Sequence, residues 1–206
     1  MAADITVVAP STLEYLATRA VVGGFRVVKS GIGRGGRPDT AGVVVICGLA
    51  GGLEPRLLPG TVVVAESVGT EAGQMVPCDK ELVRLFVAGG KQLGFAVEIV
   101  RLLTAEQIVT GDERTLWAAR GFDAVDMETA RWHSPPGRLA AVRVILDTPR
   151  KSISEQWLNS RKAMVRPELW LEMGWLAVHA PRYAVRAARV TQAGLALLAP
   201  GRPETR

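Results

Sequence analysis

The sequence predicts an α/β domain with three layers, α/β/α, around a central mixed sheet. Short apolar runs alternate with amphipathic segments over residues 5–146, as they do in layered α/β domains. The chain has 206 residues, 48% of them hydrophobic, which is enough to bury one sizeable core. After Asp147 the segments have helical periodicity. We therefore predict a single domain over residues 1–206 that ends in a helical C-terminal extension over residues 151–206.

Each predicted strand is a short apolar run, and each predicted helix is a longer amphipathic segment. The predicted strands cover residues 5–9, 25–28, 43–47, 62–66, 95–103, 124–125 and 139–146. The predicted helices cover residues 13–20, 80–91, 113–120, 154–165, 168–180 and 182–198. We place a break between the last two helices at Ala180-Pro181, because proline has no amide hydrogen to donate inside a helix.

The most informative segment is the apolar run over residues 43–47 with the glycine-rich stretch that follows it. Four consecutive β-branched residues predict a strand that is buried on both faces. Gly48, Gly51 and Gly52 predict a turn in which backbone amides can approach a ligand without interference from Cβ atoms. A tight turn without a ligand would have a similar composition, and the spacing fits neither a dinucleotide fingerprint nor a P-loop. Since ligands of α/β sheets bind where strands end, we expect a site here.

Composition narrows the class of protein. The formal net charge is +5, and arginines after residue 181 carry much of the excess, which would suit an anionic membrane or nucleic acid. No zinc-finger spacing or aromatic-rich basic strand accompanies them, so we expect no nucleic-acid partner. The two cysteines form neither a disulfide framework nor a metal cluster, and Cys47 is expected in the core. The N-terminus lacks a signal-peptide pattern, so we expect a cytoplasmic protein.

Three acidic residues stand where a strand ends or a turn begins: Glu14, Glu128 and Asp147. A carboxyl group that closes a buried strand loses solvation, which shifts its pKa and suits it to proton transfer. Each of the three could equally be a helix cap or a solvated residue at the rim of the domain. Taken singly, none of them predicts a catalytic site.

Together with their surroundings, these acids belong to an ordered set of motifs. The set consists of Lys29-Ser30-Gly31-Ile32-Gly33, Cys47-Gly48-Leu49-Ala50-Gly51-Gly52-Leu53, Leu58-Pro59-Gly60-Thr61-Val62-Val63-Val64, Thr110-Gly111-Asp112, Val125-Asp126-Met127-Glu128 and Arg143-Val144-Ile145-Leu146-Asp147. Over residues 5–148 this order resembles the nucleoside phosphorylase and nucleosidase superfamily, which includes purine nucleoside phosphorylases and methylthioadenosine/S-adenosylhomocysteine nucleosidases. The resemblance implies a phosphorylase/hydrolase-like fold and cleavage of the N-glycosidic bond of a purine nucleoside.

The resemblance also implies a role for each matching residue. Asp147 matches the acid that protonates or hydrogen-bonds N7 of the purine, and Glu14 matches the glutamate that orients or deprotonates the attacking water. Met127 and Glu128 match the pair beneath the sugar, where the Glu128 carboxylate accepts from the ribose hydroxyls. The other residues implied to bind substrate are Gly48, Leu49, Ala50, Gly51, Val125 and Asp126, and those implied to bind an anion are Ser30, Gly31 and Gly33. No metal or organic cofactor is implied, and phosphate is the co-substrate that the family admits.

Several positions depart from the family pattern. Leu49 stands where many members have a serine that contacts phosphate, and Leu146 replaces a common serine before the aspartate. Arg114 stands where nucleosidases place an aromatic residue against the base. These departures count against phosphorolysis and against the small nucleosides that most members cleave.

A second resemblance concerns a subfamily. The segment Ala50-Gly51-Gly52-Leu53-Glu54-Pro55 and the C-terminal run over residues 175–198 resemble the hopanoid-associated phosphorylases, which remove adenine from adenosylhopane. This implies a lipid-tailed substrate presented at a membrane, to which the C-terminal helices would bind peripherally. The residues of that surface would be Trp170, Trp175, Tyr183, Arg182, Arg186 and Arg189. The same helices could equally pack on the domain or on a second subunit, since we expect a homo-oligomer.

Our leading interpretation is an enzyme that cleaves the N-glycosidic bond of a purine nucleoside, an adenosyl compound, by hydrolysis. Phosphorolysis is the alternative within the same class. A nucleoside-binding protein without activity is an alternative from another class, and a basic scaffold bound to membrane or nucleic acid is a third.

Overall fold

The computed structural model describes residues 4–33, 42–133, 135–151, 153 and 170–198. Its strands are β1 (Ile5–Ala9), β2 (Arg26–Lys29), β3 (Val43–Gly52), β4 (Val62–Thr70), β5 (Met75–Pro77), β6 (Val97–Thr104), β7 (Ala124–Asp126) and β8 (Arg138–Asp147). Its helices are α1 (Thr12–Val21), α2 (Lys80–Gln92), α3 (Gly111–Ala119), the 3₁₀ helix η1 (Thr129–Trp132) and α5 (Trp170–Leu198). The predicted helix over residues 154–165 lies outside the described residues, as do residues 168–169 of the next one.

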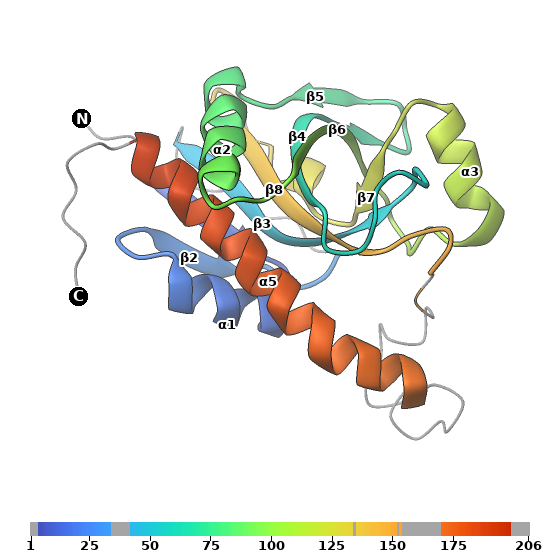
Figure 1. The fold of residues 1–206 in the computed structure, drawn as a ribbon. Helices are drawn as coiled ribbons and strands as arrows, with labels where there is room; N and C mark the ends of the chain where they lie inside the picture. Colours follow the sequence, from blue (N-terminus) through green and yellow to red (C-terminus); the bar gives the residue numbers. More distant parts are fainter. Residues whose placement is uncertain (1–3, 34–41, 134, 152, 154–169, 199–206) are drawn as a thin grey trace.

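The strands form one mixed sheet with helices on both sides (Figure 1). β1 pairs in parallel with β2 and β3, and β3 pairs in parallel with β8. β4, β6 and β7 form a second parallel group, which joins the first through the antiparallel pairs β3–β7 and β4–β8. The pairings therefore run from β3 through β7, β6, β4 and β8 back to β3, so this part of the sheet closes on itself. The predicted α/β fold with a mixed central sheet is confirmed.

The hydrophobic core follows the central strands. β1 is buried over its whole length, and β3 is buried from Val43 to Gly48. Burial on both faces accounts for the unbroken runs of valine and isoleucine in these strands. Cys47 lies in this core, as its apolar surroundings in the sequence indicated.

β3 is longer than the sequence predicted, and the predicted glycine turn at Gly48 was wrong. The strand continues to Gly52 because β8 accompanies it on one side and β7 pairs with its last two residues on the other. The glycines instead allow close approach of side chains. A Cβ at Gly48 would overlap the Glu14 carboxylate, and a Cβ at Gly51 would lie 3.0 Å from Oδ1 of Asp147.

Helix α5 runs unbroken from Trp170 to Leu198, so the predicted break at Ala180-Pro181 was wrong. Proline in a helix interior costs about 3 kcal/mol, because a backbone hydrogen bond is lost and the ring crowds the preceding turn. The second half of α5 offsets this cost by packing on α1, α2 and β8, where Ala184, Ala187 and Val190 are buried. Packing of a helix face on the domain therefore outweighs the local preference for a break.

The C-terminal half of α5 crosses the sheet between α1 and α2 (Figure 1). Arg186 donates there to the carbonyl of Gly60 and lies 5.0 Å from the ring centre of Phe95. Tyr183 packs against the core beside it, whereas Arg182 and Arg189 are exposed. Two residues of the predicted interfacial surface thus belong to the packing of α5 on the domain. No helix in the described part of the chain combines the length and apolar character needed to cross a membrane.

Candidate active site

A cavity of about 700 Å³ lies where β3, β7 and β8 end. Nine of the residues that the sequence singled out line it: Glu14, Leu49, Ala50, Gly51, Val125, Asp126, Met127, Glu128 and Asp147. Other parts of the wall come from α1, α3 and the first turns of α5. The fold therefore brings together acids from segments that are far apart in the sequence.

Glu14 is held at the N-terminus of α1 by a capping box. Ser11 is the N-cap residue: its hydroxyl accepts from the Glu14 amide over 3.2 Å, and its amide donates to Oε2 of Glu14 over 2.8 Å. The other oxygen, Oε1, accepts a 2.6 Å hydrogen bond from the Leu49 amide. Glu14 is thus both a helix-capping residue and part of the cavity wall. A carboxylate fixed in this way can orient a water molecule and take its proton.

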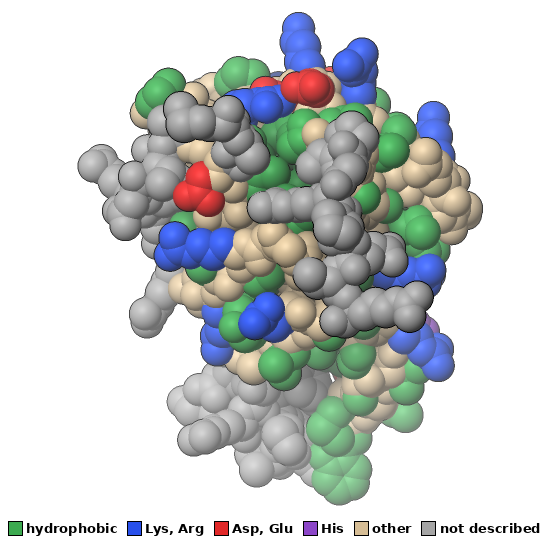
Figure 2. Space-filling view, turned by 90° about the vertical axis from the view of Figure 1, so that its left-hand side faces the viewer, with side chains coloured by type: hydrophobic (Ala, Val, Ile, Leu, Met, Phe, Trp, Pro, Cys, Tyr) green, Lys and Arg blue, Asp and Glu red, His purple; other side chains and the backbone are tan. Residues whose placement is uncertain are grey.

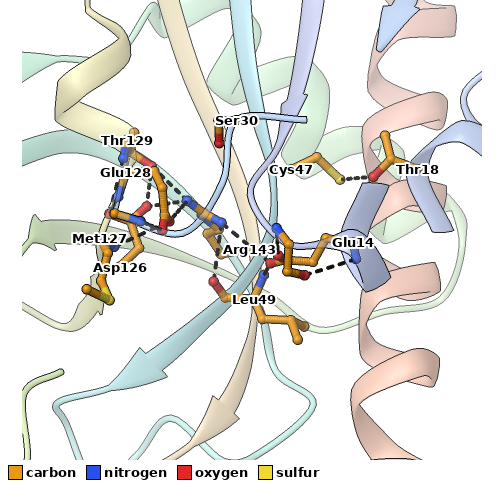
Figure 3. Close-up of polar contacts among 12 residues, drawn as sticks. Glu14, Thr18, Ser30, Cys47, Leu49, Asp126, Met127, Glu128, Thr129 and Arg143 are labelled. Atoms are coloured by element: carbon orange, nitrogen blue, oxygen red, sulfur yellow. Dashed lines mark hydrogen bonds and ion pairs between the residues drawn. The ribbon is translucent and has the colours of Figure 1, made fainter. Parts of the chain in front are cut away.

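Arg143 is the centre of a buried cluster of charges (Figure 3). Its Nη2 donates to Asp126 and lies 3.3 Å from Oε2 of Glu128, and its Nη1 lies 3.9 Å from Oε1 of Glu14. Nη1 also donates to the carbonyl of Leu49 over 3.3 Å. One guanidinium therefore faces three carboxylates, and the cluster is negatively charged when all of them are ionised.

Glu128 closes one side of this cluster. Its Oε1 accepts a 2.8 Å hydrogen bond from the Gly33 amide, while Oε2 faces Arg143. Burial raises the pKa of Glu128 to about 7, because the loss of solvation outweighs the attraction of Arg143. Glu128 therefore changes charge near neutral pH. A hydroxyl group that donates to it would favour its ionised form.

Asp126 lines the cavity, yet its oxygens are bound within the protein. They accept hydrogen bonds from the hydroxyls of Thr104 and Thr129 and from Arg143. These bonds join β6, β7, η1 and β8. The geometry therefore suits Asp126 to orienting Arg143 rather than to contacting a substrate.

Asp147 ends β8 and pairs with Arg114 of α3. Arg114 is only 2% exposed, and its other donors bind the carbonyls of Val109 and Gly52 over 2.9 and 3.1 Å. The Ile153 amide also donates to Oδ2 of Asp147 over 3.3 Å. Burial raises the pKa of Asp147, and the charge of Arg114 opposes that rise. Arg114 thus binds Asp147, whereas an aromatic residue at this position would pack against the base.

Much of the remaining wall of the cavity is apolar. Its apolar residues include Leu13, Ile32 and Ile108, together with Met173, Leu176 and Pro181 of α5. Figure 2 shows hydrophobic side chains across one face of the molecule, with lysine and arginine side chains scattered among them rather than gathered in one patch. The cavity thus combines buried carboxylates with a broad apolar wall.

Four predicted site residues do not line the cavity: Gly48, Ser30, Gly31 and Gly33. Gly48 lies against the Glu14 carboxylate. The amides of Ser30 and Gly31 donate to the carbonyls of Ala9 and Pro10, and the amide of Gly33 donates to Glu128. All three amides are therefore engaged within the protein, and their binding of an anion stays a prediction. Among the described residues, no group of three or more His, Cys, Asp or Glu side chains is placed to hold a metal ion.

The sequence did not predict a role for the two arginines of the site. Arg143 interrupts a buried apolar strand, and a buried charge needs a buried partner, so its position was a usable signal. Arg114 offered no such signal. α3 buries Arg114 while its other residues stay at least partly exposed, and its partner Asp147 is 33 positions away.

The chain belongs to the phosphorylase superfamily. The model of that family matches residues 15–131, which is more than half of the chain. This confirms the family that the sequence motifs suggested. The match ends before β8, so the arrangement of Arg143 and Asp147 is known from the structure alone. No curated protein matches the sequence.

Solved structures of nucleosidases share the fold. A methylthioadenosine/S-adenosylhomocysteine nucleosidase of Helicobacter pylori, a mutant with 5′-methylthioadenosine in its active site, superposes with a TM-score of 0.70 at 14% identity, covering 95% of this chain and 99% of its own. An S-adenosylhomocysteine nucleosidase of Streptococcus pyogenes gives 0.71 at 16% identity over 96% and 98%. The futalosine hydrolase of Helicobacter pylori gives 0.69 at 14% identity over 93% and 96%. At these identities the likeness establishes the fold.

Proposed function

We propose that this protein cleaves the N-glycosidic bond of a purine nucleoside and releases the base. The observation that carries the proposal is that Glu14, Glu128 and Asp147, from three distant segments, line one cavity. Cleavage of such a bond passes through an oxocarbenium-like state, which requires one group to neutralise the leaving base and another to position the nucleophile. Asp147 would serve the first purpose and Glu14 the second. Membership of the phosphorylase superfamily supports the reaction class, while the roles of Glu14 and Asp147 rest on their place in the cavity.

In this mechanism protonated Asp147 donates to N7 of the base while the glycosidic bond breaks. Burial favours the protonated form of Asp147 before the reaction, because it raises the pKa of the carboxyl group. Glu128 accepts hydrogen bonds from the ribose hydroxyls. The carboxylates around Arg143 stabilise the positive charge that develops on the sugar. Glu14 orients the attacking water and takes its proton.

We propose water, not phosphate, as the nucleophile. Phosphate would have to approach a cluster of three carboxylates that shares a single guanidinium, and such a cluster repels a dianion. The amides of Ser30, Gly31 and Gly33, which could have attracted phosphate, are engaged with Ala9, Pro10 and Glu128. Phosphorolysis is the alternative, and it requires phosphate for any turnover.

We propose adenosyl compounds with an apolar 5′ substituent as the substrate class, with adenosylhopane as its lipid-tailed member. The support is the apolar wall that Met173, Leu176 and Pro181 of α5 add to the cavity beside the carboxylates. Burial of a methylene group contributes about 0.8 kcal/mol, so each methylene of the substituent that reaches this wall should tighten binding by roughly fourfold.

Adenine release from 5′-alkylthio-5′-deoxyadenosines of increasing chain length tests this function. We expect kcat/KM to rise from the methyl through the butyl to the octyl compound. The variant Leu176→Glu should remove that rise, because it places a charge on the apolar wall. Val178→Glu is the matched control, since Val178 lies on the same helix, is 45% exposed and does not line the cavity. Tight adenine binding with no release from any compound would favour a nucleoside-binding protein instead.

We further propose that the first turns of α5 contact the membrane from which such a substrate would be drawn. Trp170 and Leu171 are 57% and 91% exposed there, and burial of exposed aromatic and aliphatic side chains favours an interfacial position. Sedimentation with vesicles tests this proposal. The double variant with Trp170→Ser and Leu171→Ser should lose the bound fraction, whereas an unchanged bound fraction would refute contact through these turns.

A further inference from the structure

The guanidinium of Arg114 is held by three hydrogen bonds within the protein. Its Nε and Nη1 donate to the carbonyls of Val109 and Gly52, and its Nη2 donates to Oδ2 of Asp147. The side chain is buried, so water does not compete for these bonds. Two backbone carbonyls on Nε and Nη1 orient the planar guanidinium, and Nη2 is therefore directed at Asp147.

The carboxyl group of Asp147 is fixed in turn. Its Oδ2 accepts from Arg114 and from the Ile153 amide, while Oδ1 lies beside Gly51 in the cavity wall. A Cβ at Gly51 would come within 3.0 Å of Oδ1 and 3.6 Å of Arg114 Nη2, so the glycine makes room for the pair. The two oxygens of Asp147 thus have different surroundings.

We propose that Arg114 is a positioning residue for release of the base: it binds Oδ2 of Asp147, so that Oδ1 is the oxygen presented to the purine. In this step the Oδ1–H bond of Asp147 breaks and an N7–H bond forms, while the electron pair of the glycosidic bond passes to the base. The base leaves as a neutral molecule, and Asp147 is left as a carboxylate. The charge of Arg114 stabilises that carboxylate and so favours the transfer. This inference rests on the proposed function.

Three further cations lie near Asp147 in the sequence: Arg143, Arg150 and Lys151, of which Arg150 is exposed. Lys151 follows Asp147 in the chain, but its ammonium lies over the ring of Trp175 at 3.9 Å. Arg143 precedes it on β8 and is bound in the cluster with Asp126, Glu128 and Glu14. Those three carboxylate residues line the cavity, and their carboxylates face Arg143. In the described residues, Arg114 is therefore the cation in contact with Asp147.

The test follows the ionisation of Asp147 by carbon-13 NMR of labelled aspartate carboxyl groups, with Asp147→Asn to assign the signal. In Arg114→Gln we expect the midpoint for Asp147 to rise by about one pH unit or more, because an opposite charge is removed. The alkaline limb of the pH profile of kcat should shift to higher pH by the same amount. The maximum kcat should fall by about 10- to 100-fold, with little change in KM. Arg114→Lys keeps the charge and should restore the midpoint most of the way towards that of the wild type. Arg120→Gln, an exposed position that follows α3, is the control and should change neither quantity.

A midpoint and a kcat profile in Arg114→Gln that match the wild type would overturn the inference and leave Arg114 with a structural role. The NMR titration needs no turnover, so a wild-type protein without nucleosidase activity would refute the proposed function separately. If Arg114→Gln does not fold, Arg114→Lys carries the test, because the single nitrogen of a lysine cannot occupy the three positions from which Nε, Nη1 and Nη2 of Arg114 donate. Wild-type kcat in Arg114→Lys would then contradict the positioning role.

Discussion

The carboxylate of Glu14 and the backbone amide of Leu49 are joined by a 2.6 Å hydrogen bond across 35 positions of sequence. Leu49 has no side-chain donor, yet its amide binds Glu14 and its carbonyl accepts from Arg143. The orientation of the carboxylate therefore depends on the backbone of β3 and not on a hydroxyl side chain. A leucine at position 49 can therefore make this contact without a side-chain donor.

Gly48→Ala should disturb that contact. The added methyl group would overlap the Glu14 carboxylate and lie 2.9 Å from Arg143 Nη1, so the carboxylate must move. Misplacement of a catalytic group by about 1 Å can cost on the order of 100-fold in rate, and we expect a loss of kcat of that size. Gly23→Ala is the control, because a Cβ there meets no atom within 4 Å. Activity of Gly48→Ala within about twofold of wild type would show that Glu14 is not positioned through β3.

Asp147→Asn should keep the fold and lose base release, because an amide cannot supply the proton that makes the purine a leaving group. General acid catalysis contributes about 10²- to 10⁴-fold, so the loss of kcat should lie in that range. Asp112→Asn, an exposed change on α3, serves as the control. Circular dichroism checks the fold of both variants. A kcat for Asp147→Asn within about threefold of wild type would remove Asp147 from the proton transfer.

Glu128→Ala should lower kcat/KM for ribosides far more than for 2′-deoxyribosides. The deoxy sugar lacks one of the hydroxyls that the carboxylate is proposed to bind, and a charged hydrogen bond is worth roughly 1.5 to 3 kcal/mol. The comparison is a ratio of kcat/KM values for the two sugars in the wild type and the variant. Equal losses for both sugars would place Glu128 outside the ribose site.

The stability of the protein should fall as pH rises from about 4.5 to about 7. The pKa of Glu128 is about 7 in the folded protein and 4.5 in its ordinary state, so the folded protein binds the proton more tightly than the unfolded chain does. The stabilisation is present below the lower value and is lost as pH rises through the upper one, by an amount on the order of a few kcal/mol. Urea unfolding at pH 5 and pH 8 measures it. Glu128→Gln should reduce this dependence, and an equal dependence in both proteins would assign it to other groups.

The features that local patterns encode were accessible from the sequence. Runs of β-branched residues located β1 and the start of β3, and acids at strand ends located Glu14, Glu128 and Asp147. Features that depend on partners distant in sequence were not accessible. The continuation of β3 through its glycines requires β7 and β8, and the passage of α5 through Pro181 requires α1 and α2. The pairing of Arg114 with Asp147 likewise exists only once α3 is placed against β8.

If Glu14 directs water to the sugar, the anomeric hydroxyl of the product takes its oxygen from the solvent. The wild-type protein and Glu14→Gln are incubated with an adenosyl nucleoside in phosphate-free buffer made with ¹⁸O water, and the sugar is analysed by mass spectrometry. We expect the wild type to yield a free sugar that carries the label at its anomeric hydroxyl. Glu14→Gln should yield almost none, because an amide cannot accept a proton from water. Sugar 1-phosphate as the only product, formed when phosphate is added and absent without it, would show that phosphate is the nucleophile and that Glu14 does not direct water to the sugar.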